Sequence, residues 1–274
     1  CQILAHYKYE ADQYILTLSS KEIAEATQPG QFVHLSVSGI LAMRRPISVM
    51  SVDKENGTFD LLYKIVGEGT RQLADRKIGD MLSVIGPIGN GFQMTDKKIP
   101  LLIGGGVGMP PIIAIAQNIK DNDYFSPYVI LGSEVPFPFD TVSSNLGGFY
   151  SSKIHTMPLL EEWGVQAGLT SLQSFDGVYE GYVTGLAKEY LDSLSEEDLL
   201  NVEIFTCGPH PMLEAVSKLA KDYNLPCQVS LEEYMACAVG GCAGCVVEVQ
   251  TENGPAMKRV CVDGPVFEAQ TVFQ

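Results

Sequence analysis

Six of the seven cysteines in this 274-residue chain fall between Cys207 and Cys261. Cys237, Cys242 and Cys245 share one short loop with the spacing C-x4-C-x2-C, and fifteen residues separate Cys245 from Cys261. A secreted scaffold held by disulfides distributes its cysteines along the chain. The clustering indicates instead a metal site in a reducing compartment, so we expect a cytoplasmic protein.

The spacing of these thiols separates iron from zinc. Plant-type [2Fe–2S] sites begin with the same C-x4-C-x2-C spacing. Gly240, Gly241 and Gly244 allow tight turns whose N–H groups can face bridging sulfides. Zinc ribbons present two distant C-x2-C knuckles, and here only Cys242 and Cys245 form such a pair. The pattern favours a two-iron cluster, with tetrahedral zinc as the alternative and disulfides behind both.

The acidic composition excludes several classes of partner. The chain has 33 acidic against 18 basic residues, a formal net charge of −15, whereas nucleic acids and anionic membranes attract basic faces. The uncharged run from Ile99 to Ala116 has the length of a membrane span, but three prolines and four glycines interrupt it. A helix in lipid cannot satisfy its backbone through so many breaks. The run therefore predicts a buried strand, a glycine turn and the start of a helix.

Three stretches of different pattern predict a multidomain α+β protein. Residues 1–97 hold short β-branched and aromatic segments between turn signals, which predict an antiparallel β-barrel. Residues 98–225 alternate apolar strands with helical segments, which predicts a parallel sheet with helices on both faces. Residues 226–274 form a small C-terminal domain with the cysteine loop. The expected strands are 31–37, 46–52, 58–66, 100–103, 128–131, 202–206 and 246–250.

Two segments of the first region have the chemistry of a flavin site. In the run from Arg44 to Ser48, forked arginine donors suit a pyrophosphate, and the serine hydroxyl can bond the flavin N5 region. The sequence Gly-Glu-Gly-Thr ending at Thr70 follows a strand, and glycines at a helix start expose N–H groups to phosphate. Taken alone, the arginine pair is typical of a solvated surface. Both signals in this order favour a flavin.

Two glycine-bearing turns predict a dinucleotide site. The run from Gly104 to Gly108 follows a strand and opens a helix, although its last glycine comes one residue early for G-x-G-x-x-G. Cys207-Gly208-Pro209 ends another strand of the same expected sheet. Ligands of such sheets bind beyond the carboxyl ends of the strands, so the turns indicate NAD(P) with the Cys207 thiol near the nicotinamide. A plain strand–helix turn and a small buried cysteine are the alternatives.

Taken together, the motifs resemble a known family. RRPIS, YKIVGEGT, GGGVGMPP, CGP and SLEEYMACAVGGCAGC occur in the order found in electron-transfer subunits of type B dihydroorotate dehydrogenase, and the last is the most specific. The resemblance covers nearly the whole chain and implies FAD, one [2Fe–2S] cluster, NAD(H) and a partner. That partner is an FMN-containing dihydroorotate dehydrogenase catalytic subunit, joined in a heterotetramer. One departure is Ile47, which stands where the R-x-Y-S motif of the wider ferredoxin reductase family has an aromatic residue.

The resemblance implies a set of binding residues, position by position. The cluster ligands are Cys237, Cys242, Cys245 and Cys261. The FAD residues are Arg45, Pro46, Ile47, Ser48, Leu62, Tyr63, Lys64, Gly69 and Thr70. The NAD residues are Gly104, Gly105, Gly106, Gly108, Cys207, Gly208 and Pro209. Cys1 and Cys227 are expected to be spectators.

The expected function is a relay without a catalytic side chain of its own. A nicotinamide exchanges a hydride while a two-iron cluster moves single electrons, so a flavin between them is needed. The resemblance implies electron flow from dihydroorotate through the partner's FMN, the cluster and FAD to NAD+ in pyrimidine biosynthesis. Two alternatives stand: a flavin and iron–sulfur subunit of an NAD(P)H:ferredoxin or sulfide oxidoreductase, and a zinc-bearing interaction module without redox function.

Overall fold

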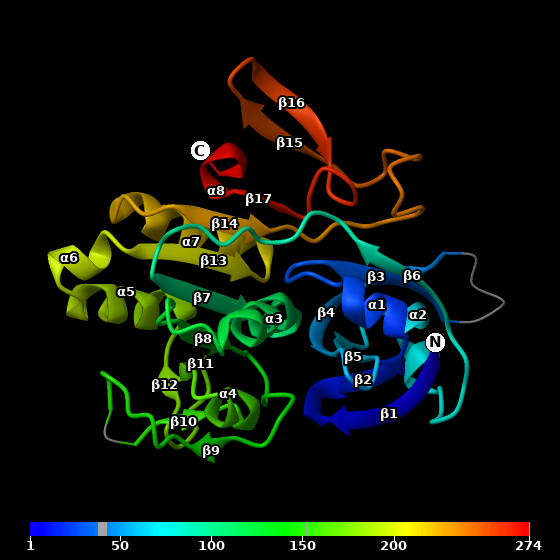
Figure 1. Cartoon of the computed structure of the whole chain (residues 1–274), viewed down its shortest axis with the longest axis horizontal. Coiled ribbons are helices and arrows are strands. Elements are labelled where there is room, and N and C mark those ends of the chain that lie inside the picture. Colours follow the sequence, from blue (N-terminus) through cyan, green and yellow to red (C-terminus); the bar gives the residue numbers. More distant parts are fainter. Residues whose placement is uncertain (38–42, 152, 274) are drawn as a thin grey trace.

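The computed structural model describes residues 1–37, 43–151 and 153–273. Its N-terminal part is a six-stranded antiparallel sheet in the order β1-β2-β5-β4-β3-β6, at the right of Figure 1. A bridge between Gln2 and Met81 joins the two edges, so the sheet closes into the predicted barrel. The strands are β1 (Gln2–Tyr9), β2 (Gln13–Ser19), β3 (Phe32–Ser36), β4 (Arg45–Asp53), β5 (Thr58–Lys64) and β6 (Ser83–Ile88).

Alternating apolar residues fill the barrel. Leu16 and Leu18 of β2 and Val33 and Leu35 of β3 are fully buried in one core, as expected where every second side chain points inward. Short helices connect the strands: α1 (Lys21–Ala26) and α2 (Glu68–Ala74). The Ser20 hydroxyl caps α1 by accepting a hydrogen bond from the Ile23 N–H (3.4 Å).

The middle part is a seven-stranded sheet in the order β12-β11-β8-β7-β13-β14-β17. All neighbours are parallel except β17, which pairs antiparallel with β14. From β7 the chain adds strands to one side and then returns to add β13 to the other, so a topological switch point lies between β7 and β13. The strands are β7 (Ile99–Gly105), β8 (Tyr128–Gly132), β11 (Gln166–Ser171), β12 (Tyr179–Glu180), β13 (Val202–Cys207), β14 (Cys227–Ser230) and β17 (Val266–Glu268).

Helices cover both faces of this sheet, as predicted. Leu102 packs with α3 (Met109–Ile119) in one core, whereas Leu101 and Ile103 pack with α5 (Val183–Ser193) and α7 (His210–Asp222) in another. The apolar run that imitates a membrane span is therefore β7, a glycine turn and α3. Within the described residues, no helix combines the length and apolarity needed to cross a bilayer. The smaller elements are η1 (Glu10–Asp12), η2 (Gly106–Gly108), β9 (Val142–Ser143), β10 (His155–Thr156), α4 (Pro158–Glu162), α6 (Glu196–Leu199) and α8 (Ala269–Val272).

The C-terminal residues share the middle sheet. Both β14 and β17 are strands of that sheet, and the cysteine loop lies on the connection between them. The remaining strands of this connection, β15 (Val246–Thr251) and β16 (Gly254–Arg259), form a separate hairpin that projects at the top of Figure 1. The sequence patterns did not anticipate the strands β14 and β17.

The barrel and the middle sheet pack tightly on each other. Met50 and Leu62 of the barrel belong to the same buried core as α3. The Gln117 amide of α3 both accepts from the Val52 N–H and donates to the Val52 carbonyl, each at 2.9 Å. Farther along, the Asn90 N–H donates to the Gly264 carbonyl (2.6 Å). Barrel, sheet and cysteine connection are therefore held in one arrangement.

Candidate functional site

The four predicted cluster cysteines come from a loop and a turn. Cys237, Cys242 and Cys245 lie in the loop after β14, and Cys261 lies in the turn after β16. The Cys242 thiol lies near enough to Cys237 to lower the pKa of that thiol, and the Cys245 thiol lies near enough to Cys261 to raise the pKa of that one, to which Cys237 adds a smaller contribution. Across the part of the chain that the structure describes, no three ligating side chains converge on a single ion. The cysteines are thus arranged as two pairs.

The loop turns backbone donors toward its sulfurs. The pKa of the Cys237 thiol is lowered to about 6, first by the Val239 backbone, then by the Cys242 thiol and backbone and the Gly241 backbone. The Gly244 N–H donates to the Cys242 Sγ at 3.4 Å. Ala238 and Ala243 adopt φ angles of 55° and 53°, a left-handed conformation that a β-carbon disfavours. The tight turns of the loop thus direct backbone N–H groups toward the sulfurs, as a group bound by thiolates requires.

The second pair lies deeper than the first. Cys245 and Cys261 are both buried, whereas Cys242 is exposed. Burial and, after it, the adjacent Cys245 thiol raise the pKa of the Cys261 thiol to about 11. Two thiolates this close repel each other unless a cation lies between them. Two pairs of thiols suit two iron ions with two thiolates each better than one tetrahedral zinc ion with four.

Arg259 links the two ligand segments. Its Nη1 donates to the Gly240 carbonyl in the loop (3.2 Å), and its Nε donates to Asp263 Oδ2 beyond the turn (3.1 Å). Hydrogen bonding and charge from Asp263 raise the pKa of Arg259, with smaller contributions from the Cys261 and Cys245 thiols. The guanidinium therefore lies within electrostatic reach of both sulfurs. No sequence motif marks this residue; only its place two residues before Cys261 hints at a role.

In the barrel, Arg45 lies directly over the start of α2. A β-carbon on Gly69 would lie 2.0 Å from the Arg45 Nε and 2.4 Å from its Cζ, so only glycine leaves room for the guanidinium. The Thr70 hydroxyl accepts hydrogen bonds from the Val66 N–H (3.0 Å) and the Gly67 N–H (3.3 Å) and so caps the helix. Arg45, Gly69 and Thr70 therefore converge, and the space around them suits a pyrophosphate.

The neighbouring Arg44 has a different role. Its guanidinium donates to the Ser83 carbonyl and hydroxyl of β6, both at 2.7 Å, and to the His34 carbonyl of β3 (3.3 Å). These bonds tie the start of β4 to its neighbour β3 and to β6, the strand beyond it. Arg44 is a structural residue, and Arg45 alone is directed at α2.

The remaining FAD candidates divide between the two sides of the barrel wall. Ile47 and Tyr63 belong to the barrel core, whereas Leu62 belongs to the core shared with α3. The Tyr63 hydroxyl lies 2.8 Å from His6 Nε2, and burial raises its pKa. Pro46, Ser48 and Lys64 are half-buried. Ile47 and Tyr63 can therefore line a flavin only from behind, through their backbone.

The two predicted nucleotide turns meet at the switch point. Gly104 pairs with Cys207 across β7 and β13. A β-carbon on Gly108 would lie 2.5 Å from the Cys207 carbonyl carbon and oxygen and from the Gly208 nitrogen, and one on Gly105 would lie 2.4 Å from Met212 Sδ. Gly106 has a φ of 56°. The structure thus brings the two predicted turns, Gly104–Gly108 and Cys207–Pro209, into contact at the place where such sheets bind nucleotides.

Cys207 has two neighbours, Ser230 and Glu232, that begin the SLEEYMAC motif but were not predicted as part of the nucleotide site. The thiol is buried, which raises its pKa well above the usual value; the Glu232 charge adds to this, while a hydrogen bond with Ser230 opposes it. Cys207 is therefore a neutral thiol. Ser230 is the last residue of β14, and Glu232 follows it closely. Because β14 lies beside β13, both residues lie at the same edge of the sheet as Cys207, and this place after a strand is the signal that could have identified them.

A hollow of about 640 Å³ lies beyond the neighbouring strands β8 and β11. Its only basic lining residue, Lys8, pairs with Asp12 at 3.2 Å. Aromatic and acidic side chains make up much of the rest, a lining that suits a base and ribose hydroxyls better than a 2′-phosphate. No sequence motif indicated this site. It is lined by Lys8, Tyr9, Glu10, Pro136, Phe137, Phe139, Asp140, Thr141, Phe175 and Val178.

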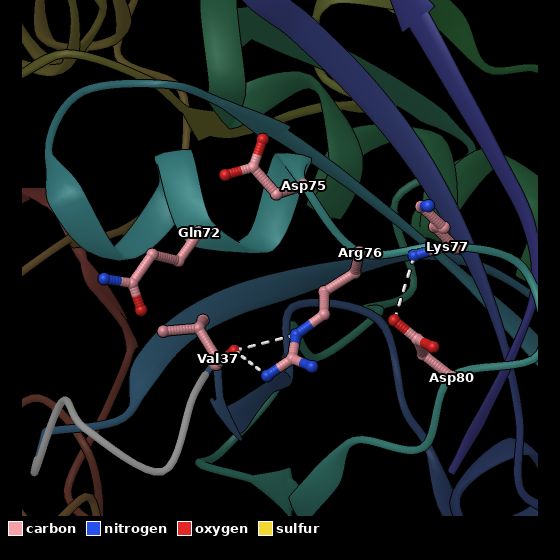
Figure 2. Close-up of a pocket in the computed structure, with 6 residues that line it drawn as sticks. All are labelled: Val37, Gln72, Asp75, Arg76, Lys77 and Asp80. Carbon is pink, nitrogen blue, oxygen red and sulfur yellow. Dashed lines mark hydrogen bonds between the residues drawn. The ribbon is translucent and has the colours of Figure 1, made fainter.

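A smaller hollow of about 250 Å³ lies at the end of α2. Figure 2 shows that the Arg76 guanidinium is directed at the Val37 carbonyl, to which Nε and Nη2 donate at 3.0 and 2.6 Å. The Lys77 N–H donates to the Asp80 carboxylate (3.1 Å). The hollow holds two basic and two acidic residues, so its charges balance and favour no ion of either sign. We interpret it as a structural feature of the barrel.

Comparison with known families supports two of the three parts. The family described as "Iron-sulfur cluster binding domain of dihydroorotate dehydrogenase B" matches residues 232–273. The family described as "Oxidoreductase FAD-binding domain" matches residues 6–92. These ranges contain the cysteine loop and the barrel.

Two curated relatives match nearly the whole chain. One, from Caldanaerobacter subterraneus subsp. tengcongensis, is 33% identical over 273 residues, covering 99% of this chain and 97% of the relative. Another, from Bacillus cereus, is 34% identical over 262 residues, covering 93% and 90%. Both are named "Dihydroorotate dehydrogenase B (NAD(+)), electron transfer subunit".

Solved structures share the architecture. An NADH-dependent reduced ferredoxin-NADP oxidoreductase matches with a TM-score of 0.81 and 25% identity, covering 99% of this chain and 88% of that chain. A ferredoxin reductase of carbazole 1,9a-dioxygenase matches with a TM-score of 0.64 and 20% identity, covering 82% and 65%.

Proposed function

This chain belongs to the family of electron-transfer subunits of dihydroorotate dehydrogenase B, and from that membership we propose its role in detail. It carries electrons between an FMN-containing dihydroorotate dehydrogenase catalytic subunit and NAD+, in pyrimidine biosynthesis in the cytoplasm. The observation that carries the proposal is the arrangement of four thiols in two pairs, on a connection of the nucleotide sheet that packs on the barrel. Bound FAD and a [2Fe–2S] cluster supply the conversion between two-electron and one-electron transfer.

We assign the three tasks to three stretches. Residues 1–97 hold FAD, residues 98–225 hold NAD and residues 226–274 hold the cluster. The shared core of Met50 and Leu62 with α3 keeps the FAD stretch against the NAD stretch. The bonds of Asn90 to the turn after Cys261 keep the cluster stretch against both.

We assign a role to the residues of each of the three sites, for FAD, for NAD and for the cluster. Arg45 and the α2 start bind the flavin pyrophosphate, while Ser48 donates toward the ring. The two glycine turns and the Cys207 neutral thiol form the nicotinamide site, and the 640 Å³ hollow takes the adenosine half. Cys237 and Cys242 would hold one iron, and Cys245 and Cys261 would hold the other. Cofactors bound at these residues would be kept in one fixed arrangement by the chain, which electron transfer between them requires.

The partner subunit docks over the cysteine loop. Tyr234 is 93% exposed and Val239 is 63% exposed, so the loop presents two large apolar side chains to a partner. Cys242 is the exposed ligand on the same loop. Contact over this surface brings the partner's FMN near the cluster, and two chains with two partners give the heterotetramer.

Spectra, association and assay test this proposal together. We expect the purified chain to show flavin and iron–sulfur absorbance, to bind a dihydroorotate-oxidising FMN subunit, and to support NAD+ reduction by dihydroorotate. The acidic adenosine hollow predicts that NADP+ is the poorer acceptor. Zinc without flavin or iron would leave only an interaction module. Absorbance without association would indicate an NAD(P)H:ferredoxin or sulfide oxidoreductase instead.

Arg45→Gln is expected to weaken FAD binding. Removing a charge-assisted bond to phosphate lowers affinity by about 10–100-fold, which fluorescence titration of the flavin-stripped protein measures. Arg44→Gln is the matched control, because its guanidinium donates instead to Ser83 and to the His34 carbonyl. It should lower the unfolding midpoint and leave the FAD dissociation constant within about threefold, a change below 1 kcal/mol. Equal losses of FAD affinity in both variants would remove Arg45 from the site.

A further inference from the structure

Arg259 contacts both segments that supply the cluster cysteines. Its Nη1 bonds the Gly240 carbonyl, which stands between Cys237 and Cys242. Its backbone N–H and Nε both donate to Asp263 Oδ2, at 2.8 and 3.1 Å. The arginine side chain is 43% exposed and that of Asp263 29%, so the pair is held at the rim of the site. A guanidinium with one bond to each segment has little freedom to leave.

The charge of Arg259 is placed beside the deeper thiol pair. Arg259 pairs with Val246, the residue after Cys245, and lies two residues before Cys261, so its guanidinium is within electrostatic reach of both thiols, while Asp263 accepts a hydrogen bond from its Nε. Arginine stays protonated at any physiological pH. A fixed positive charge next to two thiolates acts on whatever electron density those thiolates share with a bound metal.

We propose that the Arg259–Asp263 pair sets the reduction potential of the cluster held by this chain, with Arg259 as the positioning and charge-supplying member. The proposal rests on the proposed function, since it requires a [2Fe–2S] cluster at the four cysteines. One-electron reduction adds one negative charge at the site. A nearby positive charge stabilises that added charge and raises the potential, and a nearby negative charge lowers it.

The two members of the pair therefore have opposite effects. In Arg259→Gln the Asp263 charge is left uncompensated, so the potential falls. In Asp263→Asn the Arg259 charge is left uncompensated, so the potential rises; the asparagine oxygen can still accept from the Arg259 N–H. Arg259→Lys keeps the charge and loses the forked geometry. The Arg259→Gln/Asp263→Asn double variant is neutral, so its potential returns toward that of the unmodified protein.

Potentiometric titration of the full chain, followed by electron paramagnetic resonance of the reduced cluster, measures these shifts. We expect the ratio of reduced to oxidised cluster at a fixed potential to fall about three- to tenfold in Arg259→Gln and to rise by a similar factor in Asp263→Asn. Lys188→Gln and Asp192→Asn are matched controls, because this ion pair has the same i,i+4 spacing on α5. Neither control should move the ratio.

The outcomes distinguish a charge effect from damage to the loop. Shifts of opposite sign, with the double variant between them, support the proposal. Shifts of the same sign, or no shifts, overturn it. If the pair only held the loop in place, breaking it from either side would remove the cluster or change its potential in the same direction. If Arg259→Gln does not retain iron, Asp263→Asn and Arg259→Lys decide alone: the ratio must rise in the first and stay near the original in the second. An unmodified chain without a cluster would refute the proposed function instead.

Discussion

Replacing Cys242 by serine is expected to remove the cluster almost completely while sparing FAD. Serine oxygen is a poorer ligand for iron than thiolate, and Cys242 is the exposed member of its pair, open to water. Its loss leaves Cys237 without a partner thiol. Iron and sulfide analysis of the purified variant should fall to near zero, with flavin absorbance close to that of the unmodified chain.

The control for this prediction is the same substitution at another cysteine. Cys1 stands at the start of the barrel, where its N-terminal ammonium, not its thiol, donates to the Leu82 carbonyl (2.8 Å). Cys1→Ser should keep full iron and flavin content. Intact iron in Cys242→Ser would show that the ligand assignment is wrong, whereas loss of iron in both variants would indicate general damage during preparation.

Gly108→Ala is expected to be the most damaging single-methyl change in the nucleotide site. The new carbon would lie 2.5 Å from three backbone atoms of Cys207 and Gly208. Backbone cannot rotate away as a side chain can, so the two turns must move apart, at a cost near the upper end of the about 1–3 kcal/mol typical of overpacking. We expect a lower unfolding midpoint and a rise in the NADH dissociation constant of at least about tenfold.

Gly67→Ala provides the comparison. No atom lies within 4 Å of the β-carbon position at Gly67, and its φ of −174° is extended. NADH binding and the unfolding midpoint should therefore stay close to those of the unmodified chain. If Gly108→Ala binds NADH equally well, the two turns do not form the nicotinamide site.

Local patterns in the sequence predicted what depends on near neighbours. The cysteine loop, the glycine turn after Ile103 and the apolar strands each depend on a few adjacent residues. The loop, the turn and the strands lie at the residues where we expected them. The direction of a side chain cannot be predicted from adjacent residues alone, because it depends on how the strands pair. Arg44 and Arg45 are adjacent and identical, yet only the strand register decides that one bonds β6 and the other faces α2.

Long-range pairing lay beyond the sequence patterns. β14 is only four residues long, and β17 only three, so neither carries a periodicity that identifies it. The approach of Glu232 to Cys207 follows from β14 taking its place beside β13, and Arg259 reaches Gly240 only because the hairpin returns the chain to the loop. Both contacts are properties of the assembled fold.

The position of the cysteine loop between β14 and β17 has a consequence for the ancestry of the chain. The two strands are antiparallel neighbours, and the Leu231 N–H bonds the Pro265 carbonyl (2.9 Å) where the connection leaves and re-enters the sheet. The stretch from Leu231 to Pro265 is thus closed at its base. Its replacement by a short hairpin would keep the order of the remaining strands but would remove the Glu232 contact with Cys207 and the bonds to Asn90 of the barrel. An iron–sulfur cassette of this kind can therefore be exchanged as one segment, while the strand order that builds the flavin and nicotinamide sites is kept.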